Sequence, residues 1–132
     1  MRREAKILLE RGEKFLENAK ENLEKKRFDI AAFSVEQALQ LFLKHFLLFK
    51  IGEFPKTHSL KRLFSIASDF SPKLKEVFHN NISIIGNIES AYLGARYLPF
   101  DYYEDEVEEM IKFCEKIKGV ILDALQNSEK KG

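Results

Sequence analysis

Apolar residues recur every three or four positions along most of this chain, and no stretch alternates strictly between apolar and polar residues as a half-buried strand would. The repeat predicts helices over residues 3–25, 28–50, 59–70, 71–94 and 104–127, with a kink near residues 80–81. The first and last of these helices have one apolar stripe and a charged opposite face. Long helices with short connections predict an all-α protein, an antiparallel, up-and-down bundle of four to five helices.

The helix over residues 28–50 differs from the others because apolar side chains surround almost its whole circumference. A helix of this kind must be covered on all sides. In so small a domain its own neighbours can be too few, so the pattern favours a second subunit and a homodimer.

The breaks between the helices contain ordinary stop and start residues. Gly52 suits the C-terminus of the second helix. Thr57 or Ser59 is expected to cap the third helix. Ser71 followed by Pro72 marks a fresh helix start.

At 132 residues the chain is expected to form a single domain over residues 1–132, with a frayed polar tail over residues 125–132. The formal net charge of +1 argues against a broad nucleic-acid surface but allows a local basic site. Cys114 is the only cysteine, which excludes a disulfide framework. No signal-peptide core is visible, and charges interrupt the most apolar segment, residues 28–51. We therefore expect a cytoplasmic protein that does not cross a membrane.

Three segments have a recognisable order along the chain. The second helix contains "AAFSVEQALQLF", the next connection contains "PKTHSL", and the last connection contains "ARYLP". Their order and spacing resemble those of the HEPN family (higher eukaryotes and prokaryotes nucleotide-binding domain). Its small prokaryotic members have an "A..S.EQA...L" helix, a "THSL" or "THDL" helix start and a "RYP" or "RY.P" motif. The resemblance covers nearly the whole chain.

The resemblance implies a helical bundle that commonly dimerises. Many members of the family are cytoplasmic and are paired with a minimal nucleotidyltransferase in toxin–antitoxin-like operons. Catalytic members are metal-independent ribonucleases, whose motif is an arginine, a polar residue, and a histidine after four to six intervening residues. Arginine stabilises phosphate charge, and histidine transfers protons near neutral pH.

This chain departs from the ribonuclease pattern. The positions that allow the histidine hold Asp101, Tyr102 and Tyr103, and no histidine follows Arg96. An aspartate is ionised at pH 7 and repels phosphate, and a tyrosine with an ordinary pKa is a poor base. The sequence therefore favours a binding module over an enzyme. It also predicts no cofactor and no metal, because no residues have metal-ligand spacing.

Arg96 is the main candidate for holding the phosphate of a nucleotide or an RNA. The alternative is an ion pair with Asp101, Glu104 or Glu36 that fixes the loop. Resemblance also implies that Glu36 can approach the arginine loop, which makes it a further candidate for the ligand site. The alternative is that Glu36 neutralises a nearby arginine and fixes the register of two subunits. His58 is expected to cap and pack locally at a helix start, and a catalytic role is the alternative.

The aromatic residues after Arg96 have two interpretations. Tyr97, Tyr102 and Tyr103 are candidates for stacking a base. Resemblance adds that a nucleotidyltransferase can modify Tyr102 or Tyr103. The alternative is that such rings are buried with only their hydroxyls exposed, and Tyr97 and Phe100 are expected to close the end of the bundle.

Three hypotheses about function stay open. In the first, two chains pair through the second helix, bring two Arg96 loops together, and bind a nucleotide, an RNA or a nucleotidyltransferase. In the second, a degenerate ribonuclease uses Arg96 with Tyr102, Asp101 or a distant histidine. In the third, the protein is a structural dimer whose loop binds nothing. The sequence favours the first.

Overall fold

The computed structural model describes the backbone of residues 2–131 and the side chains of residues 3–127. Over this range the chain forms six helices and no strand. They are α1 (Arg2–Glu24), α2 (Phe28–Ile51), α3 (Leu60–Ser68), α4 (Pro72–Asn80), α5 (Ile82–Tyr97) and α6 (Glu104–Lys131). The prediction of an all-α bundle is confirmed.

The helix expected over residues 71–94 is divided into α4 and α5, which is why the count is six rather than four to five. The division lies at Asn81, whose φ of −135° and ψ of 29° are not helical. The Asn81 side chain donates a hydrogen bond to the Val77 carbonyl at 2.8 Å and so closes the end of α4. At the other end of the chain, α6 is helical through Lys131. Gly132 lies outside the described residues, and fraying of residues 125–132 stays a prediction.

The predicted helix ends have the expected local chemistry. Gly52 has a φ of 82°, in the left-handed region that favours glycine, and ends α2. The Ser59 hydroxyl accepts a hydrogen bond from the Arg62 backbone N–H at 3.2 Å and caps α3. The Ser71 hydroxyl accepts one from the Leu74 N–H at 3.2 Å and caps α4.

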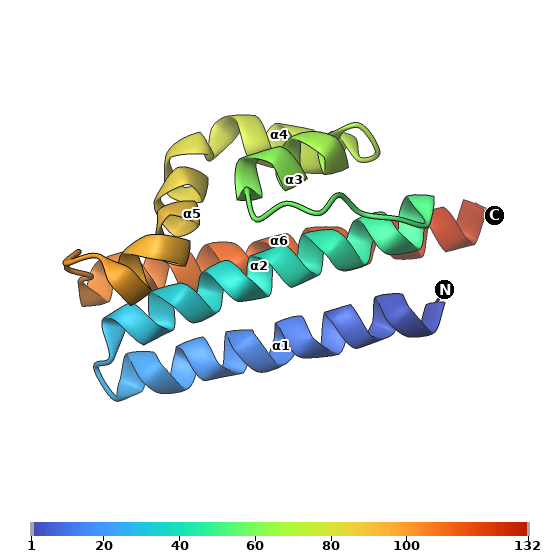
Figure 1. The fold of residues 1–132 in the computed structure, drawn as a ribbon. Helices are drawn as coiled ribbons and strands as arrows, with labels where there is room; N and C mark the ends of the chain where they lie inside the picture. The colour runs from blue at the N-terminus through green and yellow to red at the C-terminus, as the bar shows by residue number, and fades with distance from the viewer. Residues whose placement is uncertain (1, 132) are drawn as a thin grey trace.

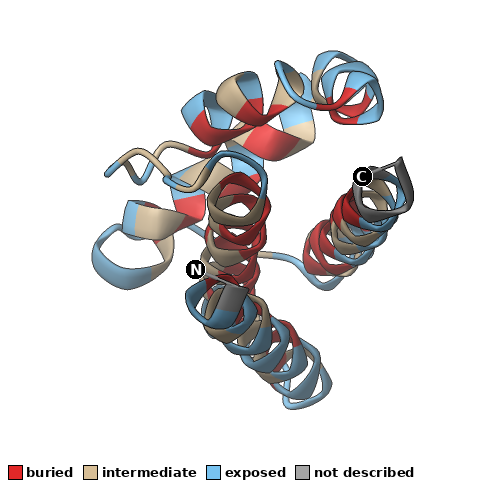
Figure 2. Cartoon of the chain, turned by 90° about the vertical axis from the view of Figure 1, so that its right-hand side faces the viewer, coloured by how far each residue is buried: buried red, intermediate tan, exposed pale blue. Residues whose placement is uncertain are grey.

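The long helix α2 lies at the centre of the molecule. In Figure 1, α1 runs in the direction opposite to α2 and α6, while α3, α4 and α5 lie across one side. Helix α2 contacts α1, α3, α5 and α6, and more than half of its residues are buried. Its ribbon is largely red at the centre of Figure 2. The chain therefore covers most of α2 itself, which weakens the argument for a second subunit from its apolar circumference. A half-exposed stripe remains, made of Phe33, Gln37, Leu41, Lys44 and Leu48.

Close packing of α1 on α2 depends on Gly12. A Cβ atom at this position would lie 2.6 Å from Cε1 of the Phe42 ring, so no larger residue fits without displacement. Phe42 is fully buried in the core. Burial of a phenylalanine ring contributes about 1.5–3 kcal/mol to the free energy of unfolding.

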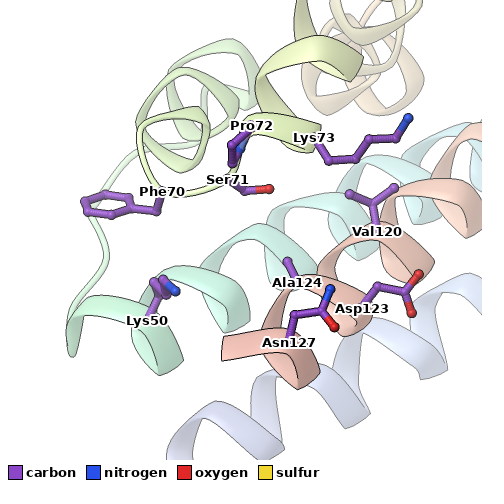
Figure 3. A pocket seen from close by; sticks show the side chains of 9 residues that line it. All are labelled: Lys50, Phe70, Ser71, Pro72, Lys73, Val120, Asp123, Ala124 and Asn127. Carbon is purple, nitrogen blue, oxygen red and sulfur yellow. The ribbon is translucent and has the colours of Figure 1, made fainter. Parts of the chain in front are cut away.

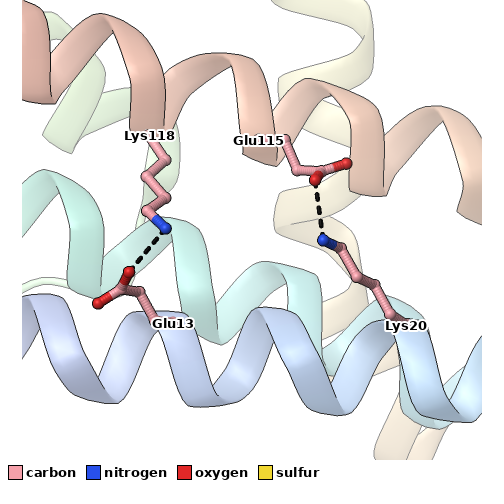
Figure 4. Close-up of polar contacts among 4 residues, drawn as sticks. All are labelled: Glu13, Lys20, Glu115 and Lys118. Carbon is pink, nitrogen blue, oxygen red and sulfur yellow. Dashed lines mark hydrogen bonds and ion pairs between the residues drawn. The ribbon is translucent and has the colours of Figure 1, made fainter.

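Two ion pairs join α1 to α6, as Figure 4 shows. Glu13 contacts Lys118 at 2.7 Å and Lys20 contacts Glu115 at 2.8 Å. Because these side chains are partly exposed, each pair contributes only about 0–1 kcal/mol. None of the described helices is both long and apolar enough to cross a membrane.

Candidate functional site

Arg96 lies in the last turn of α5 and is exposed. Its Nε donates a hydrogen bond to the Tyr92 carbonyl at 2.7 Å. The guanidinium carbon lies 4.4 Å from the centre of the Tyr92 ring and 4.8 Å from the centres of the Phe33 and Tyr97 rings. Three aromatic rings therefore hold the planar cation in place, each within the distance of a favourable cation–π contact.

The ion pair considered for Arg96 does not form in the described part of the chain. Neither Asp101, Glu104 nor Glu36 lies within ion-pair distance of its guanidinium there. An arginine side chain has five N–H donors. Of those of Arg96, only the Nε–H donates a hydrogen bond to a described residue. The terminal nitrogens of Arg96 have no hydrogen-bond partner in this part of the chain.

Glu36 is fully buried on α2, so its carboxylate cannot touch a ligand on the surface. It accepts hydrogen bonds from the side-chain amides of Gln37 at 2.7 Å and Gln40 at 2.5 Å. Burial raises the pKa of Glu36 from 4.5 to about 7, against the lowering effect of these bonds and of Arg96, while Glu89 raises it further. Glu36 is thus a neighbour of the Arg96 site rather than part of its surface.

Ser34, which precedes Glu36 in the same motif, does not face this site. Its hydroxyl is buried and accepts a hydrogen bond from the Asn18 side chain at 2.7 Å, so it faces α1.

Arg96 and the rings of Phe33, Tyr92 and Tyr97 form a group that we call the Arg96 cluster. His58 lies beside this cluster, a placement that the sequence did not predict. Its ring stacks on the Tyr92 ring with 4.7 Å between centroids and 23° between planes. Tyr92 also contacts Arg96, so one ring connects the His58 and Arg96 side chains. No local signal could have revealed this contact, because it joins the segment before α3 to α5. The expected local capping and packing therefore describes only part of the contacts that His58 makes.

Hydrogen bonds to Glu89 hold the His58 segment against α5. The Glu89 carboxylate accepts one from the Ser59 hydroxyl at 2.7 Å and one from the Lys61 backbone N–H at 3.1 Å. Beside them is an open hollow of about 340 Å³ lined by His58, Ser59, Glu89 and Tyr92. The Arg96 cluster thus continues into an open depression lined by both polar and apolar residues.

The three candidate tyrosines differ in access. Tyr97 is 70 % exposed and Tyr103 is 67 % exposed, so both are open to a ligand or a partner. Tyr102 instead packs against the core, and its hydroxyl is buried without a hydrogen bond to any described residue. Burial raises the pKa of Tyr102, and Glu106 adds to the effect.

Gly94 explains how Tyr102 reaches its position. A Cβ atom on Gly94 would lie 2.7 Å from the Tyr102 hydroxyl oxygen and would also strike the Phe100 ring. The loop can therefore fold back on α5 only because this residue is glycine. The expectation that Tyr97 and Phe100 close the bundle end was wrong for Tyr97, and Phe100 is half exposed. The Phe100 ring lies over Gly94, and the Tyr102 hydroxyl is packed beside it.

Two other features have the form of a binding site, a hollow and an acidic group. A hollow of about 540 Å³ lies near Lys50, at the end of α2 away from Phe33 (Figure 3). Its Ser71 hydroxyl already caps α4 and its Lys73 pairs with Glu76 at 3.7 Å, so these polar groups serve the fold.

The other is the start of α6, where the carboxylates of Glu104, Asp105 and Glu108 lie within 4.8 Å of one another and are largely exposed. Such acidic residues stabilise a helix N-terminus, which accounts for their positions.

Comparisons with known proteins agree with this architecture. No curated protein matches the chain. The crystal structure of TT1696 from Thermus thermophilus is similar, with a TM-score of 0.79 and 23 % identity, over 94 % of this chain and 99 % of that one. The crystal structure of ST0689, an archaeal HEPN homologue, has a TM-score of 0.71 and 17 % identity, over 92 % of this chain and 97 % of that one. The HEPN domain family model matches residues 5–125. The chain therefore belongs to the HEPN domain family.

Proposed function

We propose that this protein is a non-catalytic HEPN module that binds a phosphate-bearing ligand, a nucleotide or a short RNA, through Arg96. The observation that carries the proposal is the exposed guanidinium, fixed by three rings and without a carboxylate partner in the described part of the chain. A fixed fork of N–H donors suits phosphate, because little side-chain entropy is lost when the ligand binds. Tyr97 adds an exposed ring on which a base can stack.

The residues after Arg96 support binding rather than hydrolysis. Asp101 stands where a histidine is allowed, and its charge disfavours an adjacent phosphate. The Tyr102 hydroxyl is buried and its pKa is raised, so it is a poor proton acceptor at neutral pH. Tyr103 is exposed, and of Tyr102 and Tyr103 it is the one accessible to a modifying enzyme.

A binding titration tests the Arg96 site. Hexauridylate and ADP are titrated by calorimetry into the wild type, Arg96→Ala, Arg96→Lys and the control Arg11→Ala, which changes an exposed arginine of α1. We expect Arg96→Ala to abolish binding and Arg96→Lys to weaken it, because lysine lacks the planar fork. Equal affinity of the wild type and Arg96→Ala would refute the site. An Arg96→Ala variant that changes only thermal stability would favour a purely structural loop.

The second part of the proposal is a homodimer that places two Arg96 loops near each other. Exposed apolar residues gather around this loop: Leu93, Tyr97, Leu98, Phe100 and Tyr103. A monomer seldom leaves so many large apolar side chains exposed in one short segment. Light scattering at micromolar concentration should give twice the monomer mass for the wild type and the monomer mass for Leu93→Glu. A monomeric wild type would refute this part.

The partner assignment rests on family resemblance. We infer a cytoplasmic, toxin–antitoxin-like pair with a minimal nucleotidyltransferase as the protein partner. Co-expression of this chain with the nucleotidyltransferase encoded beside it, followed by gel filtration, tests the pairing. Failure to co-elute, or the lack of such a neighbouring gene, would contradict it.

His58 supports a second candidate function, a metal-independent ribonuclease. In this reaction His58 accepts the proton of an RNA 2′-hydroxyl, whose oxygen bonds to phosphorus as the bond to the 5′-oxygen breaks. The leaving oxygen takes a proton from water, and Arg96 stabilises the charge on the phosphoryl oxygens. The supporting observation is the shared contact of both side chains with Tyr92.

RNA cleavage in EDTA distinguishes the two candidates. The ribonuclease requires cleavage that both Arg96→Ala and His58→Gln abolish and that the control His79→Gln retains. No cleavage by the wild type would leave the binding module as the better account.

A further inference from the structure

We propose that Glu36 is a positioning residue that controls how tightly Arg96 binds an anion. Protonated Glu36 leaves the Arg96 charge available, whereas ionised Glu36 competes with the ligand for it. This inference rests on the proposed phosphate-binding role of Arg96.

The packing of α5 on α2 places the two groups near each other. Glu36 follows Phe33 by three residues, about one turn of α2, and the Phe33 ring lies 4.8 Å from the Arg96 guanidinium carbon. The Glu36 side chain is fully buried and therefore stays where the helix holds it. It acts through the electrostatic field at Arg96 and not through contact with a ligand.

The burial of Glu36 favours its neutral form, and this effect outweighs the two hydrogen bonds, which favour the charged form. Both of its hydrogen-bond donors are neutral amides, those of Gln37 and Gln40, and no described cation forms an ion pair with it. A buried carboxylate without such a pair is costly, so the group protonates more readily than it would in water. Its pKa of about 7 lies in the range where a modest change of pH changes its charge.

Other charged groups face Glu36 from the elements packed around it. On α2, the Lys44 Nζ lies 3.5 Å from the side-chain oxygen Oε1 of Gln40, whose amide nitrogen donates to Glu36. On α5, Arg96 favours the charged form of Glu36 and Glu89 opposes it. His58 contacts the same cluster through Tyr92 and is a second titratable side chain. A test must therefore separate Glu36 from His58.

The direction of the effect follows from charge. Below about pH 7 Glu36 is neutral, and the Arg96 cation attracts the ligand at full strength. Above it, the ionised carboxylate adds a negative charge in a poorly screening interior, and the affinity for an anion falls. Because the coupling is reciprocal, a bound anion must also make Glu36 harder to ionise.

Calorimetric titration with hexauridylate that lacks a terminal phosphate tests the inference, since its phosphodiesters keep their charge from pH 6 to pH 8. We expect the wild-type Kd to rise at least about fivefold over this range, the lower end of typical coupling between sites. Glu36→Gln should show a constant Kd close to the wild-type value at pH 6, and His58→Gln should keep the wild-type slope. A slope that persists in Glu36→Gln, or one that His58→Gln removes, would overturn the inference.

A second measurement keeps the test decisive if Glu36→Gln does not fold. The Glu36 carboxylate of the wild type is titrated by carbon NMR with and without hexauridylate, and its midpoint should rise when the RNA is bound. If the wild type binds no RNA at either pH, the proposed function fails. In that case the Glu36 titration of the wild type is compared with that of Arg96→Ala. Loss of the Arg96 cation should raise the titration midpoint of Glu36. An unchanged midpoint in either comparison would refute the coupling.

Discussion

Glu36→Gln should make the protein more stable above neutral pH. The substitution replaces a fully buried carboxyl group by a neutral amide of nearly the same shape. The amide oxygen can still accept one of the two hydrogen bonds from Gln37 and Gln40, and the other glutamine must turn its amide so that its oxygen accepts from the new NH2 group. The wild type must bury a charge at high pH and the variant does not. Near pH 4.5 the wild-type carboxyl is neutral in the folded protein, so the two proteins should then differ little.

The size of the effect follows from the pKa of Glu36, which burial raises from 4.5 to about 7. Between pH 4.5 and about pH 7, the folded protein keeps the Glu36 proton that the unfolded chain has lost. The free energy of unfolding therefore falls as pH rises through this range, and it becomes constant above about pH 7. Each pKa unit corresponds to about 1.4 kcal/mol, so the loss at pH 8 is about 3 kcal/mol. Glu36→Gln should recover most of it.

Urea unfolding followed by far-ultraviolet circular dichroism measures this free energy at several values between pH 4.5 and pH 8.5. The quantity of interest is the difference between the variant and the wild type, because other titrating groups cancel in it. Glu17→Gln, at an exposed position of α1, is the matched control and should show no such trend. A difference between Glu36→Gln and the wild type that stays constant with pH would refute the reasoning.

Three further substitutions test the packing. Gly94→Ala should displace the Phe100 ring and the Tyr102 hydroxyl, cost about 1–3 kcal/mol and weaken hexauridylate binding; unchanged near-ultraviolet circular dichroism and affinity would contradict the role of this glycine. Phe42→Ala should lower the free energy of unfolding by about 3–5 kcal/mol, because the ring is fully buried, and a loss under about 1 kcal/mol in urea would contradict it. Ser71→Ala should cost about 1 kcal/mol through the lost cap, whereas the exposed control Ser65→Ala should cost clearly less in the same assay.

Local features of the chain were sufficient for much of the fold. Apolar spacing predicted each long helix to within a few residues, since a helical face repeats within a few neighbouring positions. Caps such as Ser59 and Ser71 were predictable because a cap bonds a backbone N–H only three residues away. The break at Asn81 was expected as a kink and became a full division. Sequence alone left its extent open, because the packing of α4 and α5 on other helices decides it.

The candidate site was predictable only in part. The motif drew attention to Arg96, but its partners were not foreseen. A carboxylate was considered, and the structure has Phe33, Tyr92 and Tyr97 instead. The three tyrosines were equivalent in the sequence, yet Tyr102 is turned inward over Gly94. Such differences depend on which side of a loop meets the core, and no local rule encodes that.

The amino-acid sequence by itself determined that this protein is helical, where most of its helices begin and end, and which family motifs it contains. The helices and their ends arise from contacts between residues a few positions apart, and the motifs can be read directly from the chain. Only the tertiary structure decided that His58 stacks beside Arg96 and that the Glu36 carboxyl is buried on α2. Both depend on how α5 and the segment before α3 pack on α2. Packing between distant segments sets the burial and the electric field that a side chain experiences, and these in turn set its chemistry.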